Sequence, residues 1–275
     1  MGVALALLSA LAFGLSDIAA GVAARRLHSA VVAFIGQLAG VVLTAAAALL
    51  VAAPSVTGTA LGWGALAGIG TGLGAAFLFQ AMSVGRFSIV VPLSDVAGVA
   101  IPVLIGVALL GDHIGPAAWC GFALSVPALW LITSKTGPRG GSAAGARWAL
   151  LSGAAFSLQY LALAQADPAA GLWPLVLNRV GAVLSVAPWA VRRERLRMQK
   201  GTFGIAVLSG VLGTVAIAAF WFASREQALS IAVVLTSLYP VVPVLAGIAV
   251  FHEPVTRRLL VGLGLALATV VLISL

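Results

Sequence analysis

Charged residues are scarce in this chain of 275 residues. Asp, Glu, Lys and Arg together account for 8% of the residues, whereas they account for about 25% of an ordinary soluble domain. Hydrophobic residues account for 62%, and the mean hydropathy is +1.16. The few charges are clustered, and long uncharged runs lie between them. This composition excludes a soluble globular protein with an ordinary polar surface.

Several residue patterns that carry catalysis or metal binding are also missing. The sequence has no Gly-Lys-Ser/Thr phosphate-binding loop, which argues against ATP-driven transport. His28, His113 and His252 are too scattered for a typical metal cluster. No serine–histidine–acid or cysteine–histidine set is recognisable. We therefore expect that the protein is not an enzyme and holds neither a cofactor nor a metal.

Cysteine is almost absent as well. The single cysteine, Cys120, cannot form an internal disulfide, and because it lies in an apolar segment we expect it to pack against neighbours. The first apolar segment carries Asp17 and lacks a basic n-region, so we expect no cleavable signal peptide.

Long apolar runs fill most of the chain instead. A bilayer core about 30 Å thick needs about 20 apolar residues for each spanning helix. The sequence therefore predicts an all-α integral membrane protein with ten transmembrane helices. The predicted helices are at about 3–24, 31–52, 60–84, 88–110, 115–133, 147–166, 170–190, 203–224, 229–251 and 256–274.

The second half of the chain repeats the first. Each half contains an apolar helix that begins with Ser-Ile, is interrupted by proline and ends in a short acidic turn. Because five helices are an odd number, the second copy enters the membrane inverted, as in many secondary transporters. We expect two five-helix repeats, 1–133 and 147–275, joined by a flexible linker at 134–146. The offset of 142, or a slip of one residue, aligns Ser88 with Ser230, Pro102 with Pro243, Asp112 with Glu253, Gln37 with Arg179, and Asp17 with Tyr160.

Lysine and arginine gather in the loops of one predicted face. The opposite loops carry Asp112, Asp167, Glu226 and one basic residue, Arg225. Cytoplasmic loops are enriched in Lys and Arg, so we expect the basic face in the cytoplasm and both termini outside. The same bias explains the net charge of +8 without a nucleic-acid partner. The basic-face residues are Arg25, Arg26, Arg86, Lys135, Arg139, Arg147, Arg192, Arg193, Arg195, Arg197, Lys200, Arg257 and Arg258.

Two pairs of short motifs carry a family resemblance. The first member of one pair is Phe79-Gln80-Ala81-Met82 together with residues 88–93, and the second member is the proline-containing stretch 237–243. The other pair is the acidic turns Gly111-Asp112-His113 and His252-Glu253-Pro254. With these motifs the chain resembles the EamA-type ten-helix carriers of the drug/metabolite transporter (DMT) superfamily over essentially its whole length.

The resemblance implies a carrier for small metabolites, drugs or amino acids. It implies that helices 1–4 and 6–9 surround a central cavity and that helices 5 and 10 lie at the periphery. The chain departs from the family pattern at Asp112-His113, where glutamate and a basic residue are commoner, and at Gln37, where an arginine is often seen. Family members are usually drawn with both termini in the cytoplasm, opposite to the charge bias.

Three ionisable side chains fall inside predicted membrane helices: Asp17, Asp95 and Arg179. A charge within a bilayer is costly, so each is a functional candidate. Burial favours the neutral form of a carboxylate, which makes Asp17 and Asp95 candidate proton carriers. Arg179 stays charged and could neutralise an acidic substrate. Two alternatives remain open: an ion pair between Arg179 and either aspartate, and a lipid-facing position.

Polar and aromatic residues of the same helices complete the candidates for substrate or proton binding. Asp17 and Tyr160 are equivalent in the two halves, and equivalent residues of an inverted repeat approach the same midplane. For each glutamine, an interhelical hydrogen bond is an equally good interpretation. The further candidates are Gln37, Gln80, Gln159, Asn178, Trp221 and Tyr239.

Prolines and glycines mark special backbone positions. Prolines within predicted helices 4 and 9 free backbone carbonyls and form either hinges or static kinks. The hinge candidates are Pro92, Pro102, Pro240 and Pro243. Small residues at regular spacing in predicted helix 3 indicate close helix packing. These are Gly68, Gly70, Gly72 and Gly74.

Together these features predict a secondary active transporter, an exporter that works by alternating access and is coupled to protons. We expect a multi-pass protein of the cell (inner or cytoplasmic) membrane of a prokaryote. Its expected partners are a small-molecule substrate and the lipid bilayer, and a homodimer is left open. One alternative is a non-transporting membrane protein, such as a lipid-handling or assembly partner. The other is a channel, but the chain has few polar residues to line a continuous pore.

Overall fold

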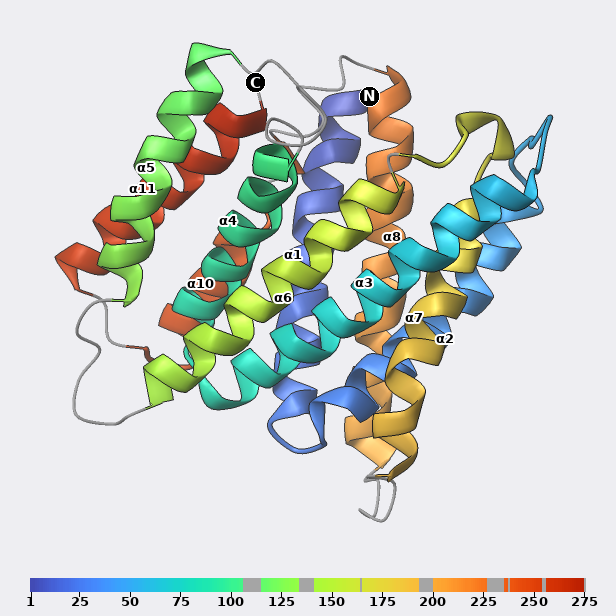
Figure 1. Cartoon of the computed structure of the whole chain (residues 1–275). Helices are drawn as coiled ribbons and strands as arrows, with labels where there is room; N and C mark the ends of the chain where they lie inside the picture. Colours follow the sequence, from blue (N-terminus) through green and yellow to red (C-terminus); the bar gives the residue numbers. More distant parts are fainter. Residues whose placement is uncertain are drawn as a thin grey trace.

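The computed structural model describes residues 1–105, 115–133, 141–163, 165–192, 200–226, 235–236, 238–253 and 256–274. Every regular element in these ranges is helical (Figure 1). The helices are α1 Gly2–Ala24, α2 Ser29–Ala48, α3 Gly58–Val84, α4 Phe87–Ile105, α5 Pro116–Thr133, α6 Gly141–Leu163, the 3-10 turn η2 Pro168–Ala170, α7 Trp173–Arg192, α8 Lys200–Glu226, α10 Val241–Ala249 and α11 Arg257–Ser274.

Polar side chains define where several helices begin. The His28 side chain accepts a hydrogen bond from the Ala30 backbone nitrogen at 3.2 Å, and Thr57 Oγ1 accepts one from the Ala60 nitrogen at 3.2 Å. Such caps satisfy N–H groups that lack a partner in the first turn of a helix. They explain why α2 and α3 begin directly after these residues.

The observed helix boundaries differ from the expected ones at two places. Helix α6 begins at Gly141, inside the stretch expected to be a linker, and residues 134–140 lie outside the described residues. The helix expected at 229–251 has a turn at 238–240, and α10 begins at Val241. Pro240 occupies the N-cap of α10, and Pro243 lies in its first turn, where a missing N–H costs no intrahelical bond.

Five described helices are long and apolar enough to cross a bilayer: α1, α2, α3, α7 and the Gly201–Phe220 part of α8. Large apolar side chains are exposed along them, among them Val42 and Leu184. In a bilayer such side chains contact lipid, and the helices satisfy their own backbone polar groups. The chain is therefore a multi-pass membrane protein. Cys120 is also exposed, on α5, so the expectation that it packs against neighbours was wrong.

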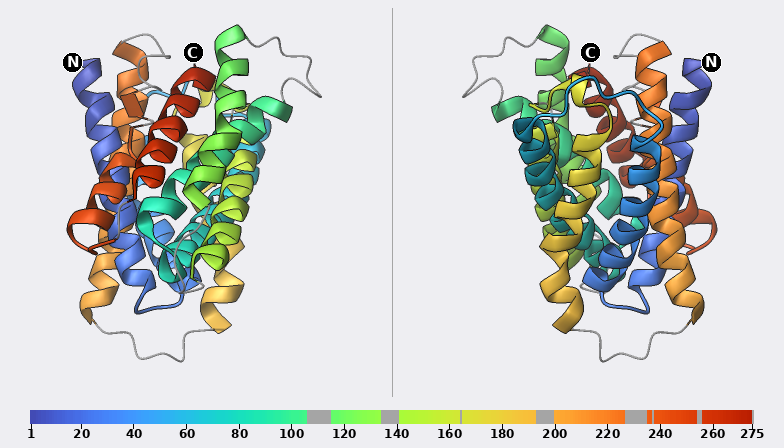
Figure 2. Two further views of the ribbon diagram at one scale, coloured as in Figure 1. Left: turned by 90° about the vertical axis from the view of Figure 1, so that its left-hand side faces the viewer. Right: turned by 90° about the vertical axis from the view of Figure 1, so that its right-hand side faces the viewer.

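The helix ends lie on two opposite sides of the bundle. Both termini lie on one side in Figure 1, and α1 and α6 run in opposite directions (Figures 1 and 2). The α1–α2 and α3–α4 connections, with Arg25, Arg26 and Arg86, lie on the other side. The start of α6 and the end of α7 lie toward that side too.

Helices α3 and α8 each pack against two helices of the other half of the chain. Helix α3 packs against α6 and α7, and α8 packs against α1 and α2. Glycine makes this packing possible, because a Cβ on Gly68 would lie 2.2 Å from the Asn178 carbonyl oxygen. A Cβ on Gly210 of α8 would likewise lie 2.1 Å from the Gly36 carbonyl oxygen of α2. The prediction of close helix packing at the α3 glycines is therefore confirmed.

The contact between α2 and α8 predicts a test of this packing. Gly210→Ala forces the two backbones apart, and we expect it to lower the free energy of unfolding by about 1–3 kcal/mol, the usual cost of overpacking. The measurement is thermal unfolding in detergent followed by tryptophan fluorescence. The matched control is Gly204→Ala on the same helix, where a Cβ meets nothing within 4 Å. Equal behaviour of the two variants would contradict the role given to Gly210.

Candidate functional site

Four of the predicted site residues come together from four segments. Asp17 lies on α1, Asp95 on α4 and Tyr160 on α6, while Tyr239 lies in the turn before α10. The Tyr239 and Asp95 side chains are hydrogen-bonded, and the charges of the two aspartates interact. The hydroxyl groups of Tyr160 and Tyr239 both interact electrostatically with the carboxylates of Asp17 and Asp95. We call these four residues the carboxylate cluster.

A glycine on α1 allows Tyr239 to reach this position. A Cβ on Gly14 would lie 2.9 Å from the Tyr239 carbonyl oxygen and 2.4 Å from Val242 Cβ. The rings of Phe13 and Tyr239 pack with centroids 5.9 Å apart. Since Gly14 and Phe13 are neighbours on α1, the same helix supports both the backbone and the ring of Tyr239.

Serine hydroxyls set the position of α4 relative to α6. Ser94 Oγ donates to Ser152 Oγ at 2.9 Å, and Ser152 Oγ donates to the Gly74 carbonyl oxygen at 2.8 Å. This buried chain of hydrogen bonds joins α4, α6 and α3. Ser94 is the neighbour of Asp95, so the chain holds the backbone from which that carboxylate extends.

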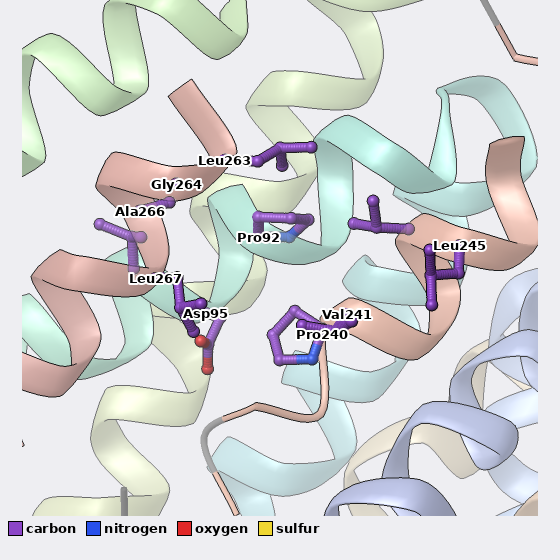
Figure 3. Close-up of a pocket in the computed structure, with 11 residues that line it drawn as sticks. Pro92, Asp95, Pro240, Val241, Leu245, Leu263, Gly264, Ala266 and Leu267 are labelled. Atoms are coloured by element: carbon purple, nitrogen blue, oxygen red, sulfur yellow. The ribbon is translucent and has the colours of Figure 1, made fainter. Parts of the chain in front are cut away.

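Asp95 also lines a pocket between α4, α10 and α11 (Figure 3). The pocket has a volume of about 180 Å³, and among the described residues that line it Asp95 is the one with an ionisable side chain. Gly264 of α11 leaves open space on the pocket wall, because a Cβ there would meet nothing within 4 Å. The lining residues are Pro92, Asp95, Val96, Pro240, Val241, Val244, Leu245, Leu263, Gly264, Ala266 and Leu267.

Arg179 lies apart from the carboxylate cluster, between α7 and α2. Its Nη1 donates to Gln37 Oε1 at 2.7 Å, and both side chains are buried. Within the described ranges, no ion pair joins Arg179 to Asp17 or Asp95. The interpretation in which Arg179 pairs with an aspartate to hold helices together therefore has no support in the structure.

The other predicted candidates have different surroundings. Thr71 Oγ1 accepts from Asn178 Nδ2 at 2.8 Å and donates to Gln159 Oε1 at 2.7 Å, which links α7, α3 and α6. Gln80 Oε1 accepts from Ser29 Oγ at 2.9 Å. These three amides therefore make interhelical hydrogen bonds. The side chains of Trp221 and Pro102 lie outside the described residues.

Sequence reasoning did not predict a contact that joins the two halves at the basic side. The Glu253 carboxylate accepts hydrogen bonds from the Phe87 nitrogen at 2.8 Å, the Ser88 nitrogen at 3.0 Å and Ser88 Oγ at 2.5 Å. It therefore caps the first turn of α4, where the helix dipole favours an anion. Arg86 Nε lies 3.9 Å from the same carboxylate. The only sequence signal was the acidic turn that contains Glu253.

Aromatic rings and an arginine extend this contact. Phe87 and Phe251 stack with centroids 4.8 Å apart, and the Arg25 guanidinium lies 4.9 Å and 4.4 Å from the two ring centroids. Cations are attracted to the faces of aromatic rings. We call Arg25, Arg86, Phe87, Phe251 and Glu253 the basic-side latch, because they join α1, the start of α4 and the turn after α10.

The latch predicts a stabilising role for the charge of Glu253. Glu253→Gln removes the anion that accepts three hydrogen bonds, and we expect a loss of about 1.5–3 kcal/mol, the usual value for hydrogen bonds to charged groups. Thermal unfolding in detergent measures this loss. Glu226→Gln is the control, because that carboxylate is 42% exposed and lies 3.9 Å from the amino terminus. A shift no larger than that of the control would argue against the latch.

The comparisons with known proteins concern the fold and the family. No curated protein matches this chain. Twelve chains of solved structures match it. One of them, a crystal structure of a protein, is 16% identical, covers 98% of this chain and 96% of its own, and superposes with a TM-score of 0.58. At 16% identity, this similarity shows only that the two chains share a fold.

The second half of the chain carries the family identification. Residues 143–275, which include α7, α8, α10, α11 and most of α6, match the model of the EamA-like transporter family. This agrees with the resemblance carried by the proline-containing and acidic-turn motifs. Residues 143–275 are thus similar to the EamA-like transporter family, which belongs to the drug/metabolite transporter superfamily.

Proposed function

We propose that this protein is a secondary active transporter that exports a small metabolite, amino acid or drug by alternating access, coupled to protons. Similarity to the EamA-like family indicates a membrane transporter. The observation that carries the proposal further is the carboxylate cluster. Asp17 and Asp95 lie in membrane helices and influence each other's charge, and no ion pair to either is found in the described part of the chain.

Proton coupling follows from the cost of two neighbouring negative charges away from water. Burial and a nearby like charge both favour the neutral, protonated form of a carboxylate. A proton or a cationic substrate relieves the same repulsion, so the two compete for one site. Competition of this kind is sufficient to couple substrate movement to a proton gradient.

Alternating access is supported by the way the two halves pack. The contacts of α1 with α8 correspond to those of α6 with α3, and the contacts of α2 with α8 correspond to those of α7 with α3. Gln37 and Arg179, equivalent by sequence offset, are hydrogen-bonded to each other. This pattern is expected for an inverted repeat, in which the substrate site lies between the halves.

Two devices fit a change of access from one side of the membrane to the other. Pro92 and Pro240 lie on the pocket wall, where interrupted backbone permits bending, and we propose them as hinges together with Pro243 and Pro102. The basic-side latch closes that side by tying α4 to the turn after α10. Arg179, bonded to Gln37, is proposed as a permanent positive charge for an acidic group of the substrate.

One observation favours a second candidate, a non-transporting protein that handles a lipid. The pocket at Asp95 includes Val241 and Leu245, which are 40% and 59% exposed on an apolar helix. Its rim therefore faces the hydrocarbon of a bilayer, as expected of a site for a lipid. Transport measurements separate this candidate from the first.

The transport test uses proteoliposomes, a metabolite mixture and mass spectrometry, with and without a pH gradient. We expect the wild-type protein to exchange at least one solute, with a rate that depends on the gradient. Asp17→Asn and Asp95→Asn should abolish that dependence, because an amide cannot bind and release a proton. Arg179→Gln should lower the rate for acidic solutes only.

The matched control for the transport test is Asp167→Asn. Asp167 is exposed, and its Oδ1 accepts a hydrogen bond from the Ala169 nitrogen at 2.8 Å, which an asparagine oxygen can replace. This variant should transport like wild type. If no solute moves in any pH gradient, the lipid-handling candidate gains support. If all variants behave alike, the carboxylates are structural.

We also propose that the protein lies in the inner (cytoplasmic) membrane of a prokaryotic cell, with its basic side in the cytoplasm and both termini outside. Single-cysteine variants Arg26→Cys and Ser55→Cys, made in a Cys120→Ser background, place probes at the two ends of α2. A membrane-impermeant maleimide applied to intact cells should label the second variant and spare the first. The reverse labelling would favour the orientation usual for the family.

A further inference from the structure

We propose that the pocket between α4, α10 and α11 binds a small amphiphilic organic cation, with its ammonium group at Asp95 and its apolar body against α10 and α11. This inference rests on the proposed function and names one substrate class for it, at a site separate from Arg179, whose proposed role concerns solutes with an acidic group. Three properties of the pocket support this proposal: the charge of its lining, the apolar character of the rest of its wall, and the exposed residues at its edge, which we call the rim.

The described lining of the pocket carries no positive charge. Within it Asp95 is the one ionisable residue, while Arg179 is bonded to Gln37 between α7 and α2. The Tyr239 hydroxyl is hydrogen-bonded to Asp95. A carboxylate has about four acceptor sites, so one hydrogen bond from tyrosine leaves sites for an ammonium group. An anionic ligand would be repelled by the carboxylate of Asp95 and also by that of Asp17.

The rest of the lining is apolar. Apart from Asp95, the residues of the pocket wall that the structure describes are proline, valine, leucine, alanine and glycine. Its volume of about 180 Å³ lies below the roughly 300–1,000 Å³ of pockets for drug-sized ligands. A single ring or short alkyl chain that carries one amine suits this size. A sugar would leave its hydroxyl groups without partners against this wall.

The rim of the pocket explains how such a ligand arrives. Val241 and Leu245 are exposed on α10, and Leu263 and Gly264 face them from α11 (Figure 3). Because these are apolar helices of a membrane protein, the rim contacts lipid rather than water. An amphiphilic amine concentrates in the bilayer and can reach Asp95 sideways between the two helices.

The test is equilibrium binding to the purified protein in lipid nanodiscs, with protein-free nanodiscs as the blank. The probe is 2-phenylethylammonium, and its two isosteric controls are the neutral 2-phenylethanol and the anionic 3-phenylpropanoate. We expect saturable binding of the ammonium probe and at least about tenfold weaker binding of both controls. Equal binding of the alcohol would overturn the inference in favour of a purely apolar or lipid-occupied site, and so would no saturable binding of the amine.

Variants then locate the bound probe. Asp95→Asn should weaken binding of the amine about tenfold or more, and Asp95→Glu should retain part of it. Gly264→Leu fills the open wall of the pocket and should abolish binding, whereas Gly204→Leu, which also points into open space, should have no effect. Unchanged binding in Gly264→Leu would overturn the assignment to this pocket even if Asp95→Asn fails to fold.

Binding and transport can fail separately. If the amine binds at Asp95 but no solute moves across proteoliposomes, the proposed transport function fails and the binding site stands. If another solute is moved in a pH-dependent way while the amine does not bind, the transport function stands and this inference fails.

Discussion

Close approach of helix backbones is the constraint on which the structure depends. Within a bilayer, helices gain little from hydrophobic association, so packing relies on van der Waals contact and interhelical hydrogen bonds. Glycine at positions such as 68 of α3 and 210 of α8 leaves no room for a Cβ. Because of these contacts, α3 and α8 can each pack against two neighbours from the other half of the chain.

This helix packing creates three separate groups of interacting polar residues. The carboxylate cluster joins α1, α4, α6 and the turn before α10, and the Gln37–Arg179 hydrogen bond joins α2 and α7. The latch joins α1, the start of α4 and the turn after α10. Arg179 is thereby kept apart from the two aspartates. In the described part of the chain neither carboxylate is in an ion pair, which is the basis for proposing that a proton or a cationic ligand neutralises them.

The latch and the pocket lie at opposite ends of one stretch of α4. Glu253 caps the first turn of α4 at Phe87 and Ser88, while Pro92 and Asp95 line the pocket about one and two turns further along. Helix α10 has the same arrangement in reverse, because Pro240 and Val241 line the pocket and Glu253 follows its end. The latch and the pocket are therefore built on the same two helices, α4 and α10.

Composition and hydropathy alone determined a helical membrane protein, because a bilayer imposes local rules on every spanning segment. They also singled out Asp17, Asp95 and Arg179 as ionisable residues of apolar segments. The offset of 142 also aligned Gln37 with Arg179, which meet in the structure. Only the tertiary structure decided that Arg179 bonds Gln37 rather than an aspartate, that Glu253 caps α4, and that Gly264 leaves a pocket beside Asp95. These contacts join residues more than a hundred positions apart, and hydropathy carries no information about which helix faces which.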